Sequence, residues 1–297
     1  MARLVTTLDA IPADAALALP TAAASLHGHV QGYVYRDCLV DREVIRPVSA
    51  NTNPMLVFRL GDVYEAYEYV TGRFRELPEA MLVGPQSRRP ADLRITGRHV
   101  VFIVCFQPAA LSRLFGLPDS EFLGTAVDAA DYLGAGVREL MRHLREAHAR
   151  GAEPAELRQG VEDFLQARLA ASVEEVPILR AALALHHSHG RAALDRLAEE
   201  SGHSLRHFNR AFQRQFGMTP KRYARVVRFG YAMRLKLDRP RLSWADVSQE
   251  AGYYDQNHMA KEFKCLVGEG PSAFLKSVSA SPEHFRQPPP GLMSVSY

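Results

Sequence analysis

Long apolar runs are missing from this sequence of 297 residues. No stretch reaches the roughly 18 consecutive apolar residues that a membrane-spanning helix needs, so we expect no membrane partner. The N-terminal residues alternate Ala, Leu, Pro and Asp, and they lack the basic start and continuous apolar segment of a signal peptide. The sequence therefore predicts a cytoplasmic protein.

Cysteine is scarce as well. The three cysteines, Cys38, Cys105 and Cys265, are isolated and odd in number, which suits a reducing cytoplasm better than a disulfide framework. The sequence also lacks a Cys-x-x-Cys pair, a Walker loop, a G-x-G-x-x-G fingerprint and a G-x-S-x-G elbow. We therefore expect no cofactor and no enzymatic activity.

Histidine pairs are the nearest approach to a metal site. His27-x-His29 could supply two ligands from one side of a strand, as in metal-binding cupins, but the next Glu is as distant as Glu43. His186, His187 and His189 fall at a predicted helix end, where histidine interacts well with the helix dipole. We expect no metal. The alternative is a cupin-type metalloenzyme fused to a helical domain that does not bind DNA, and stoichiometric metal after purification would favour it.

What the sequence does contain is a repeat, which runs from Leu194 to Phe274. Val247 and Gly252 lie 50 positions after Leu197 and Gly202. After one extra residue in the second copy, further positions recur 51 residues after their counterparts, at Met259, Lys261, Phe263, Gly268, Pro271 and Phe274. A match at apolar, basic, Gly and Pro positions alike predicts one supersecondary unit used twice.

Each copy predicts a helix, a tight turn and a second helix. In the first copy Gly202 suits the left-handed end of one helix and Ser204 caps the next. Phe residues at every fourth position, Phe208 to Phe216, predict a buried face on that second helix. The opposite edges are polar in both copies, with Arg206, Asn209, Arg210 and Gln213 in the first and Gln256, Asn257, Ala260, Lys261 and Lys264 in the second. Because Arg matches guanine and Asn or Gln matches adenine in the major groove, these edges predict two DNA-reading helices.

The segment between the copies predicts a single helix. Pro220 suits its first turn, and the residues from Lys221 to Leu237 contain no Gly or Pro except Gly230. About 17 residues give a rod of roughly 26 Å, comparable with the turn of DNA of about 34 Å. We therefore predict that the rod places both reading helices in successive major grooves. A break at Gly230 would remove this geometry.

Charge is divided unequally along the chain. The segment from Arg180 to Lys276 carries 17 Lys and Arg against 9 Asp and Glu, a net charge of +8. The remainder carries 19 basic and 24 acidic residues, a net charge of −5. Because the positive segment coincides with the repeat, this distribution favours phosphate binding over a merely solvated basic face.

The motifs Ser204-x-Arg206-x-Phe208-x-Arg210-x-Phe212 and Ala251-Gly252-Tyr253-x-Asp255-Gln256 resemble the C-terminal DNA-binding region of the AraC/XylS family of transcription regulators. The resemblance implies a sequence-specific regulator of double-stranded DNA, with a homodimer and RNA polymerase as further possible partners. Together, the resemblance and the polar edges assign to DNA the residues Ser204, Arg206, His207, Asn209, Arg210, Gln213, Arg214, Asp255, Gln256, Asn257, His258, Ala260, Lys261 and Lys264.

Three positions depart from the pattern of that family. Lys261 stands where the family usually has Arg, and a lysine lacks the bidentate fork, so we expect weaker base discrimination by the second helix. Cys265 and Glu269 are also unusual, and the sequence offers no functional account of them.

The N-terminal half predicts a different architecture. Segments rich in β-branched and aromatic residues, separated by Gly and Pro turns such as Thr96-Gly97, occur at residues 29–35, 55–60, 64–70, 80–83, 93–96 and 100–106. They predict an antiparallel barrel or sandwich, preceded by an irregular or helical lead-in over residues 1 to 24. The motif Val83-Gly84-Pro85-Gln86 and the segment Leu114–Pro118 resemble the N-terminal domain of one AraC-like subgroup. In the broader family this domain is often cupin-like and either senses a small-molecule effector or mediates dimer formation.

Two questions about this half stay open at the level of sequence. The helical pair predicted over residues 137–170 forms either a dimer surface or the cover of its own barrel. Seven aromatic residues either line a pocket for a small organic ligand or fill the core, namely Tyr33, Tyr35, Phe58, Tyr64, Tyr67, Tyr69 and Phe102.

The predicted fold class is α+β. We expect an N-terminal cupin-like antiparallel β-barrel or sandwich with appended helices at 1–172, a DNA-binding domain at 173–278 and a loose tail at 279–297. The DNA-binding domain is predicted to be all-α, with its two helix-turn-helix units joined by a long helix.

Overall fold

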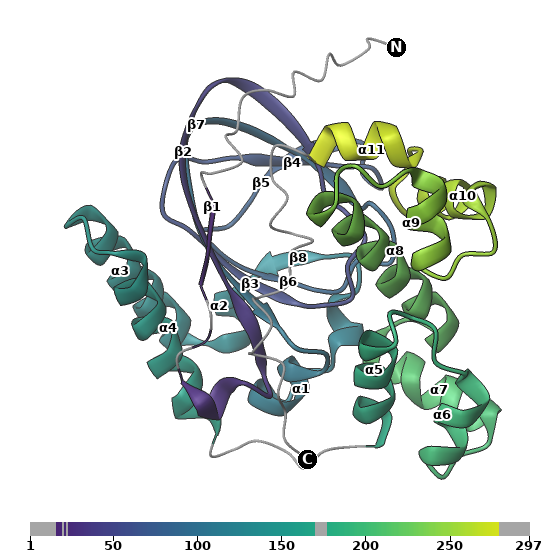
Figure 1. Ribbon diagram of the computed structural model, residues 1–297. Coiled ribbons are helices and arrows are strands. Elements are labelled where there is room, and N and C mark those ends of the chain that lie inside the picture. Colours follow the sequence, from purple (N-terminus) through teal and green to yellow (C-terminus); the bar gives the residue numbers. More distant parts are fainter. Residues whose placement is uncertain (1–15, 20, 22, 170–176, 279–297) are drawn as a thin grey trace.

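The computed structural model describes residues 16–19, 21, 23–169 and 177–278 and is shown in Figure 1. It has the predicted α+β class, with an N-terminal antiparallel sheet and a C-terminal helical domain. The strands are β1 (Ala16–Leu19), β2 (Val30–Pro47), β3 (Met55–Arg59), β4 (Glu65–Glu68), β5 (Arg73–Glu76), β6 (Ala80–Val83), β7 (Ala91–Phe106) and β8 (Ala126–Asp128).

The helices of the N-terminal domain are the 3-10 turns η2 (Ala24–Leu26) and η3 (Asp119–Phe122) and the α-helices α1 (Ala110–Phe115), α2 (Ala129–Leu133), α3 (Ala135–Ala149) and α4 (Pro154–Leu169). Those of the C-terminal domain are α5 (Pro177–His187), α6 (Leu194–Glu200), α7 (Leu205–Phe216), α8 (Pro220–Asp238), α9 (Trp244–Glu250), α10 (Gln256–Val267) and α11 (Pro271–Val278). The expected boundary at 172/173, the first 15 residues and the tail at 279–297 lie outside the described residues.

Two long strands form the spine of the sheet. The strand order is β1-β2-β7-β3-β6-β8, and β4 joins β7 to β5. β2 and β7 pair from Val30 opposite Phe106 to Pro47 opposite Asp92, with an irregularity between Val40 and Val44. Figure 1 shows both strands bending across the domain. The irregularity lets two such long strands bend while they remain paired.

Several strand predictions were wrong. Segments 93–96 and 100–106 are one strand, because Gly97, at φ 76°, sits within β7 instead of ending a strand. Residues 16–19 were predicted to belong to an irregular or helical lead-in, but they form β1 and pair with Tyr33–Arg36. β5, β8 and the second half of β2 were not predicted. Their sequences are polar or short, so pairing with a neighbouring strand and not local propensity decides their structure.

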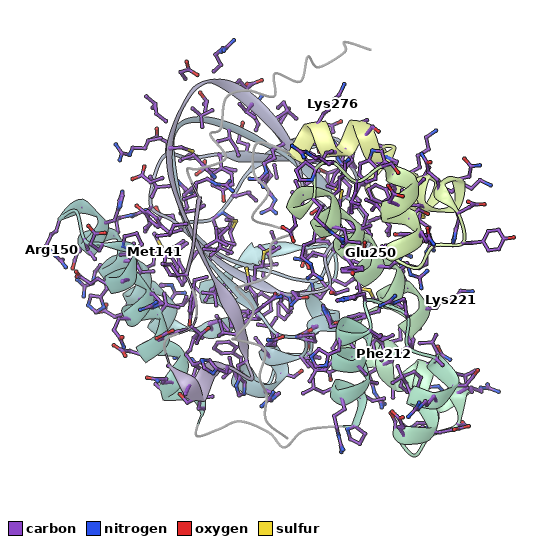
Figure 2. All side chains as sticks on the ribbon, in the orientation of Figure 1. Met141, Arg150, Phe212, Lys221, Glu250 and Lys276 are labelled. Carbon is purple, nitrogen blue, oxygen red and sulfur yellow. The ribbon has the colours of Figure 1, made fainter. Side chains whose placement is uncertain are left out.

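Helices cover one face of the sheet. Phe58 and Phe102 of the sheet share one apolar core with Leu140 of α3 and Val161 of α4. The apolar stripes of α3 and α4 are therefore buried on their own sheet, which is one of the two arrangements that the sequence left open. Figure 2 shows Met141 on α3 and Arg150, the residue that follows this helix, at the edge of the molecule.

The opposite face of the sheet carries a second apolar cluster that includes Val34, Cys38, Val57, Val101 and Ile103. We call this face the inner face. The predicted aromatic set is divided between the two sides: Tyr33, Phe58 and Phe102 belong to the core under the helices, whereas Tyr64 belongs to the inner face. The aromatic residues therefore do not line one common pocket.

The C-terminal domain has two cores that share one helix. α5, α6 and α7 enclose the first core with Tyr223 and Val227 of α8. α9, α10 and α11 enclose the second core with Phe229 and Met233 of the same helix. Within the described residues, no helix is both long and apolar enough to cross a membrane.

Candidate nucleic-acid interface

The first helix-turn-helix unit consists of α6 and α7. Gly202 takes a φ of 70° in the turn between them. The Ser204 side chain then caps α7 by accepting a hydrogen bond from the backbone N–H of His207 at 3.3 Å. Phe208, Phe212 and Phe216 lie on one side of α7 and are each 0% exposed, and Figure 2 shows Phe212 within this unit. Burial of this apolar side determines which side of α7 meets solvent.

The solvent side of α7 carries most of the predicted DNA-binding residues of this unit. Arg206, Arg210 and Gln213 are exposed. Asn209 is half-buried, and its Nδ2 donates to the Leu205 carbonyl at 2.8 Å. The edge therefore offers two guanidinium forks and two amides for base or phosphate contacts.

Two predicted residues of the first unit point elsewhere. His207 and Arg214 line a cavity of 380 Å³ on the flank of α7 that faces the N-terminal domain, opposite Ser112 and Arg113 of α1. Both residues are nevertheless exposed to solvent. Ser204 has a structural role as the helix cap.

The second unit repeats the arrangement with α9 and α10. A capping box between Ser243 and Asp246 starts α9, and Gly252 takes a φ of 78° in the turn. Asp255 caps α10 by accepting the His258 backbone N–H at 2.6 Å. Met259, at 0% exposed, anchors the inward side of α10. The two copies are therefore matched in caps, turns and buried anchors.

The outward side of α10 brings together the remaining predicted residues. Gln256, Asn257, Lys261 and Lys264 are exposed and Ala260 is half-buried. His258 is half-buried and lies 3.7 Å from Glu262. This edge has amides and ammonium groups where the first has guanidinium forks, so it is the less directional of the two for base recognition.

The long helix α8 holds the two units together. It contains 19 residues and passes through Gly230 without interruption, which corresponds to a rod of roughly 28 Å. Arg225 of α8 pairs with Glu262 of α10 at 2.6 Å, and Glu262 is only 7% exposed. α8 therefore connects both reading helices as a continuous strut.

Two exposed apolar side chains beside the reading helices were missed by sequence reasoning. Tyr254, in the turn before α10, is 92% exposed, and Leu205, at the start of α7, is 43% exposed. Both residues therefore present apolar surface to solvent near the start of the second helix of their unit. The sequence gives little indication that Tyr254 is exposed, because the same residue type precedes it at Tyr253, whose side chain is buried.

The N-terminal domain contacts the first unit through η3 and α1. The Ser120 hydroxyl donates to the Arg214 carbonyl at 2.6 Å, and the Gln215 side chain donates to the Ser112 hydroxyl at 2.7 Å. Nearby, Asp119 accepts the backbone N–H of Ala109 at 3.1 Å, and burial raises the pKa of Asp119 to about 7. The end of α7 is thus hydrogen-bonded to the N-terminal domain.

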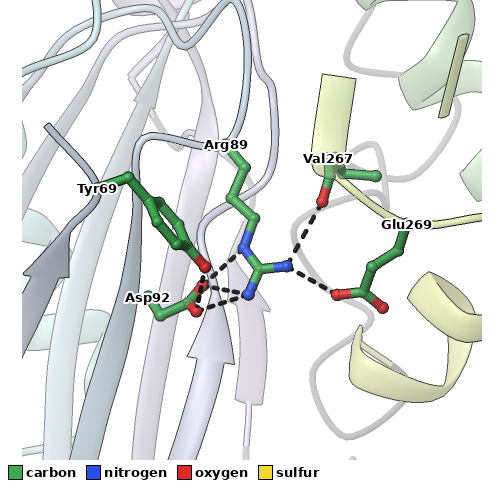
Figure 3. Close-up of polar contacts among 5 residues, drawn as sticks. All are labelled: Tyr69, Arg89, Asp92, Val267 and Glu269. Carbon is green, nitrogen blue, oxygen red and sulfur yellow. Dashed lines mark hydrogen bonds and ion pairs between the residues drawn. The ribbon is translucent and has the colours of Figure 1, made fainter. Parts of the chain in front are cut away.

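A second contact joins the N-terminal domain to the second unit (Figure 3). The carboxylate of Asp92 accepts three hydrogen bonds here, two from the guanidinium of Arg89 and one from the hydroxyl of Tyr69. Arg89 also pairs with Glu269 at 2.7 Å and donates to the Val267 carbonyl at the end of α10. This contact, which we call the Arg89 clasp, accounts for the unusual Glu269.

The histidines do not form the metal site that the sequence suggested as an alternative. His27 and His29 both precede β2 and do not share a face of a strand. Burial, followed by the charge of Arg113, lowers the pKa of His29 to about 4. Burial likewise lowers the pKa of His186 to about 4, and His186 contacts Thr52 and Tyr223. Among the described residues, no three His, Cys, Asp or Glu side chains converge as metal ligands.

Two family models match separate parts of the chain. Residues 197–277 match a helix-turn-helix domain, and residues 20–128 match a domain of unknown function, DUF6597. Over 86 residues the chain is 36% identical to an uncharacterized HTH-type transcriptional regulator of Haemophilus influenzae. The matched segment covers 29% of this chain and only 28% of that relative.

Two solved structures of ToxT from Vibrio cholerae are each similar in fold to 82% of the chain. The form with a bound unsaturated fatty acid has a TM-score of 0.50 at 7% identity, covering 82% of this chain and 94% of that one. The form solved at 1.65 Å has a TM-score of 0.48 at 8% identity, covering 82% and 97%. At these identities the comparison concerns the fold alone.

Proposed function

Residues 197–277 form a helix-turn-helix domain of the AraC type, and from this premise we propose that the chain is a sequence-specific transcription regulator. In this proposal α7 and α10 read two neighbouring major-groove segments of one promoter site. The observation that carries it is the pair of exposed polar edges, on matched helices, joined by the uninterrupted strut α8. Two major-groove segments on one side of DNA lie about 34 Å apart, which a strut of this length and its flanking turns can span.

The residues divide by role. We propose that Arg206, Arg210, Gln256 and Asn257 contact base edges, because they combine exposure with the fork or amide groups that bases match. Lys261 and Lys264 contact phosphates, because an ammonium group acts as a point charge. His207, Arg214 and Tyr254 contact the backbone at the flanks of the two helices.

The other partners follow from the same proposal. A ToxT structure contains an unsaturated fatty acid, and we propose that a small molecule bound by the N-terminal domain modulates this chain too. A homodimer and a contact with RNA polymerase remain predictions from the family resemblance. No residue is assigned a catalytic role.

Binding to promoter fragments tests the proposal. The double variant Arg206→Ala/Arg210→Ala should lose at least about 10-fold in affinity and relax specificity in one half of the site, since each base contact contributes about 1–3 kcal/mol. Lys261→Ala should instead weaken all sequences similarly and reduce the salt dependence by about one phosphate contact. The fragments are best obtained by selection from random DNA and measured by gel shift and fluorescence anisotropy at several salt concentrations.

A matched control is Arg142→Ala, which removes an exposed, ion-paired arginine from α3. It should bind DNA like the unaltered protein. Selection that enriches no sequence, or full affinity retained by the double variant, would refute DNA reading through these helices.

A further inference from the structure

The cavity of 380 Å³ beside α7 lies at the junction between the N-terminal domain and the first helix-turn-helix unit. Its lining comes from residues in or next to α1, α5 and α7, which lie together at one end of the molecule (Figure 1). Within this lining the Gln215 side chain donates to the Ser112 hydroxyl at 2.7 Å, so both domains form the walls. Small-ligand sites are common at domain junctions and have volumes of about 300–1,000 Å³, and this cavity matches both features.

One part of the lining is apolar. It consists of Ala109 before α1, Ile178 and Leu179 of α5, and Ala211 of α7. These residues are each at most 9% exposed, and all four belong to the first core of the C-terminal domain. Water gains nothing from contact with such a surface, whereas an apolar group that covers it is removed from water. The wall therefore favours a ligand with an apolar body.

The rest of the lining carries positive charge and hydrogen-bond donors. Arg214, His203 and His207 all come from the first unit, and the two imidazole rings lie 4.4 Å apart. No carboxylate of the described residues lines the cavity, and the guanidinium of Arg214 forms no ion pair with them. Arg113 also lines the cavity, but it is already engaged, since its Nη1 donates to the Gly28 carbonyl at 3.0 Å. The rim of the cavity therefore suits an anionic group at Arg214.

We propose that this cavity, which we call the junction site, binds a small organic anion with an apolar body. The guanidinium of Arg214 holds the anionic group, because its planar fork matches a carboxylate or a phosphate. The body lies against Ile178 and Leu179. This assigns a chemical class to the effector and places it between the domains. Binding at the junction site does not depend on the proposed function.

The junction site shares residues with the flank of the first reading helix. His207, Ala211 and Arg214 are at positions i, i+4 and i+7 of α7 and so form one stripe along it. The proposed function places His207 and Arg214 against the DNA backbone, and the next step rests on that function. A bound anion competes with a DNA phosphate for Arg214. We expect it to weaken DNA binding and to reduce the salt dependence by about one phosphate contact.

Thermal unfolding of the full chain with benzoate, phenyl phosphate, benzamide and acetate, at equal ionic strength and pH, tests the junction site. We expect benzoate, phenyl phosphate or both to raise the melting temperature in a saturable way, by roughly 5 °C at 100 times the dissociation constant. Benzamide lacks the charge and acetate lacks the apolar body, so neither should raise it at the same concentration. A larger response to benzoate assigns a carboxylate as the anionic group, and a larger response to phenyl phosphate assigns a phosphate ester.

Variants locate the response in the cavity. Arg214→Met should abolish the rise, and Arg214→Lys should reduce it, because lysine keeps the charge but lacks the fork. Ala211→Leu should also abolish it, because the larger side chain fills the apolar part while the charge stays. The matched control is Arg222→Met, which removes an exposed arginine of α8 that does not line the cavity and should keep the full rise.

Three results would overturn the junction site. These are no rise with either aromatic anion, an equal rise with benzamide or acetate, and an undiminished rise in Arg214→Met. If Ala211→Leu does not fold, Arg214→Met decides, because Arg214 is exposed and outside the cores.

Gel shifts with and without the effective anion are read separately. DNA affinity that a stabilising anion leaves unchanged would refute competition at Arg214. Stabilisation by the anion in a chain that binds no DNA sequence would count against the proposed function and leave the junction site standing. Selective DNA binding without any stabilisation would have the opposite meaning.

Discussion

At the scale of single residues, Asp119 shows how one buried carboxyl group supports the interface between the two halves of the chain. It is 0% exposed, and its carboxylate accepts the N–H of Ala109. Ala109 has a φ of 58°, in the left-handed region that is unfavourable for a residue with a side chain. The hydrogen bond therefore stabilises a strained turn immediately before α1, the helix that contacts α7.

Asp119→Asn should change how stability depends on pH. Burial raises the folded pKa of Asp119 from 3.8 to about 7, so the folded state keeps a proton that the unfolded state has released. The Asp119 contribution is fully present below pH 3.8 and is lost as the pH rises towards 7. Relative to the natural chain, the Asn variant should therefore gain about 1.4 kcal/mol per pH unit across this window and nothing more above it.

Denaturant unfolding at several pH values measures this difference. Asp119→Ala serves as the control, because it loses the hydrogen bond to Ala109 as well as the ionisable group. A stability difference between Asn and Asp that is independent of pH would show that Asp119 ionises normally in the folded protein.

At the scale of elements, α8 is the feature on which the proposed reading of two DNA segments depends. Gly230 lies inside this helix, and a Cβ added there meets no atom within 4 Å. Glycine is a poor helix former that no close contact requires at this position. The continuity of α8 therefore comes from its packing on both cores.

Substitutions at Gly230 distinguish the effect of helix propensity on stability from the effect of a rigid α8 on DNA affinity. Gly230→Ala should raise the free energy of unfolding by about 1 kcal/mol and leave DNA affinity unchanged. Gly230→Pro should cost about 3 kcal/mol, kink α8 and weaken binding to a two-segment DNA site by at least about 10-fold. The Ala variant is the control for the Pro variant. Equal affinity of both for the full site would mean that the two helices do not need a rigid connection.

At the scale of the whole molecule, the N-terminal domain touches both helix-turn-helix units. It reaches the first through Ser120 and Ser112 and the second through the Arg89 clasp. The N-terminal domain therefore bridges the two units in addition to α8.

Arg89→Ala should loosen this docking. The change removes charge-assisted hydrogen bonds to Asp92 and Glu269, which together contribute about 2 kcal/mol to stability. It also removes the positive charge that compensates the buried carboxylate of Asp92, which is 9% exposed. Trp244, the single tryptophan, packs against Phe263 in the second unit and reports on that unit alone. Its fluorescence transition in denaturant should move below the circular-dichroism transition of the whole chain.

Arg88→Ala is the matched control, since it removes an exposed arginine from the adjacent position. Its two transitions should coincide, as they should in the natural chain. Coincident transitions in Arg89→Ala would mean that the clasp does not couple the second unit to the N-terminal domain.

The reading helices were predictable because their determinants are close together in the chain. The four-residue spacing of Phe208, Phe212 and Phe216, the glycine turn and the Ser204 cap each act within one or two helical turns. The predicted DNA-binding positions are a consequence of that spacing, and they remain predictions until DNA is bound. Their separation into a DNA-facing edge and a flank that faces α1, where His207 and Arg214 lie, was not predictable.

The sequence by itself determined the duplicated unit, the connecting helix and the division of charge, because these follow from local periodicity and from composition. Only the tertiary structure decided that Arg36 and Arg59 share one buried face, since their alignment depends on the register of both strands with β7. It alone brought Arg89 to Glu269, 180 residues further along the chain. Strand register and domain docking arise from contacts between residues far apart in sequence, and local propensity carries no information about such contacts.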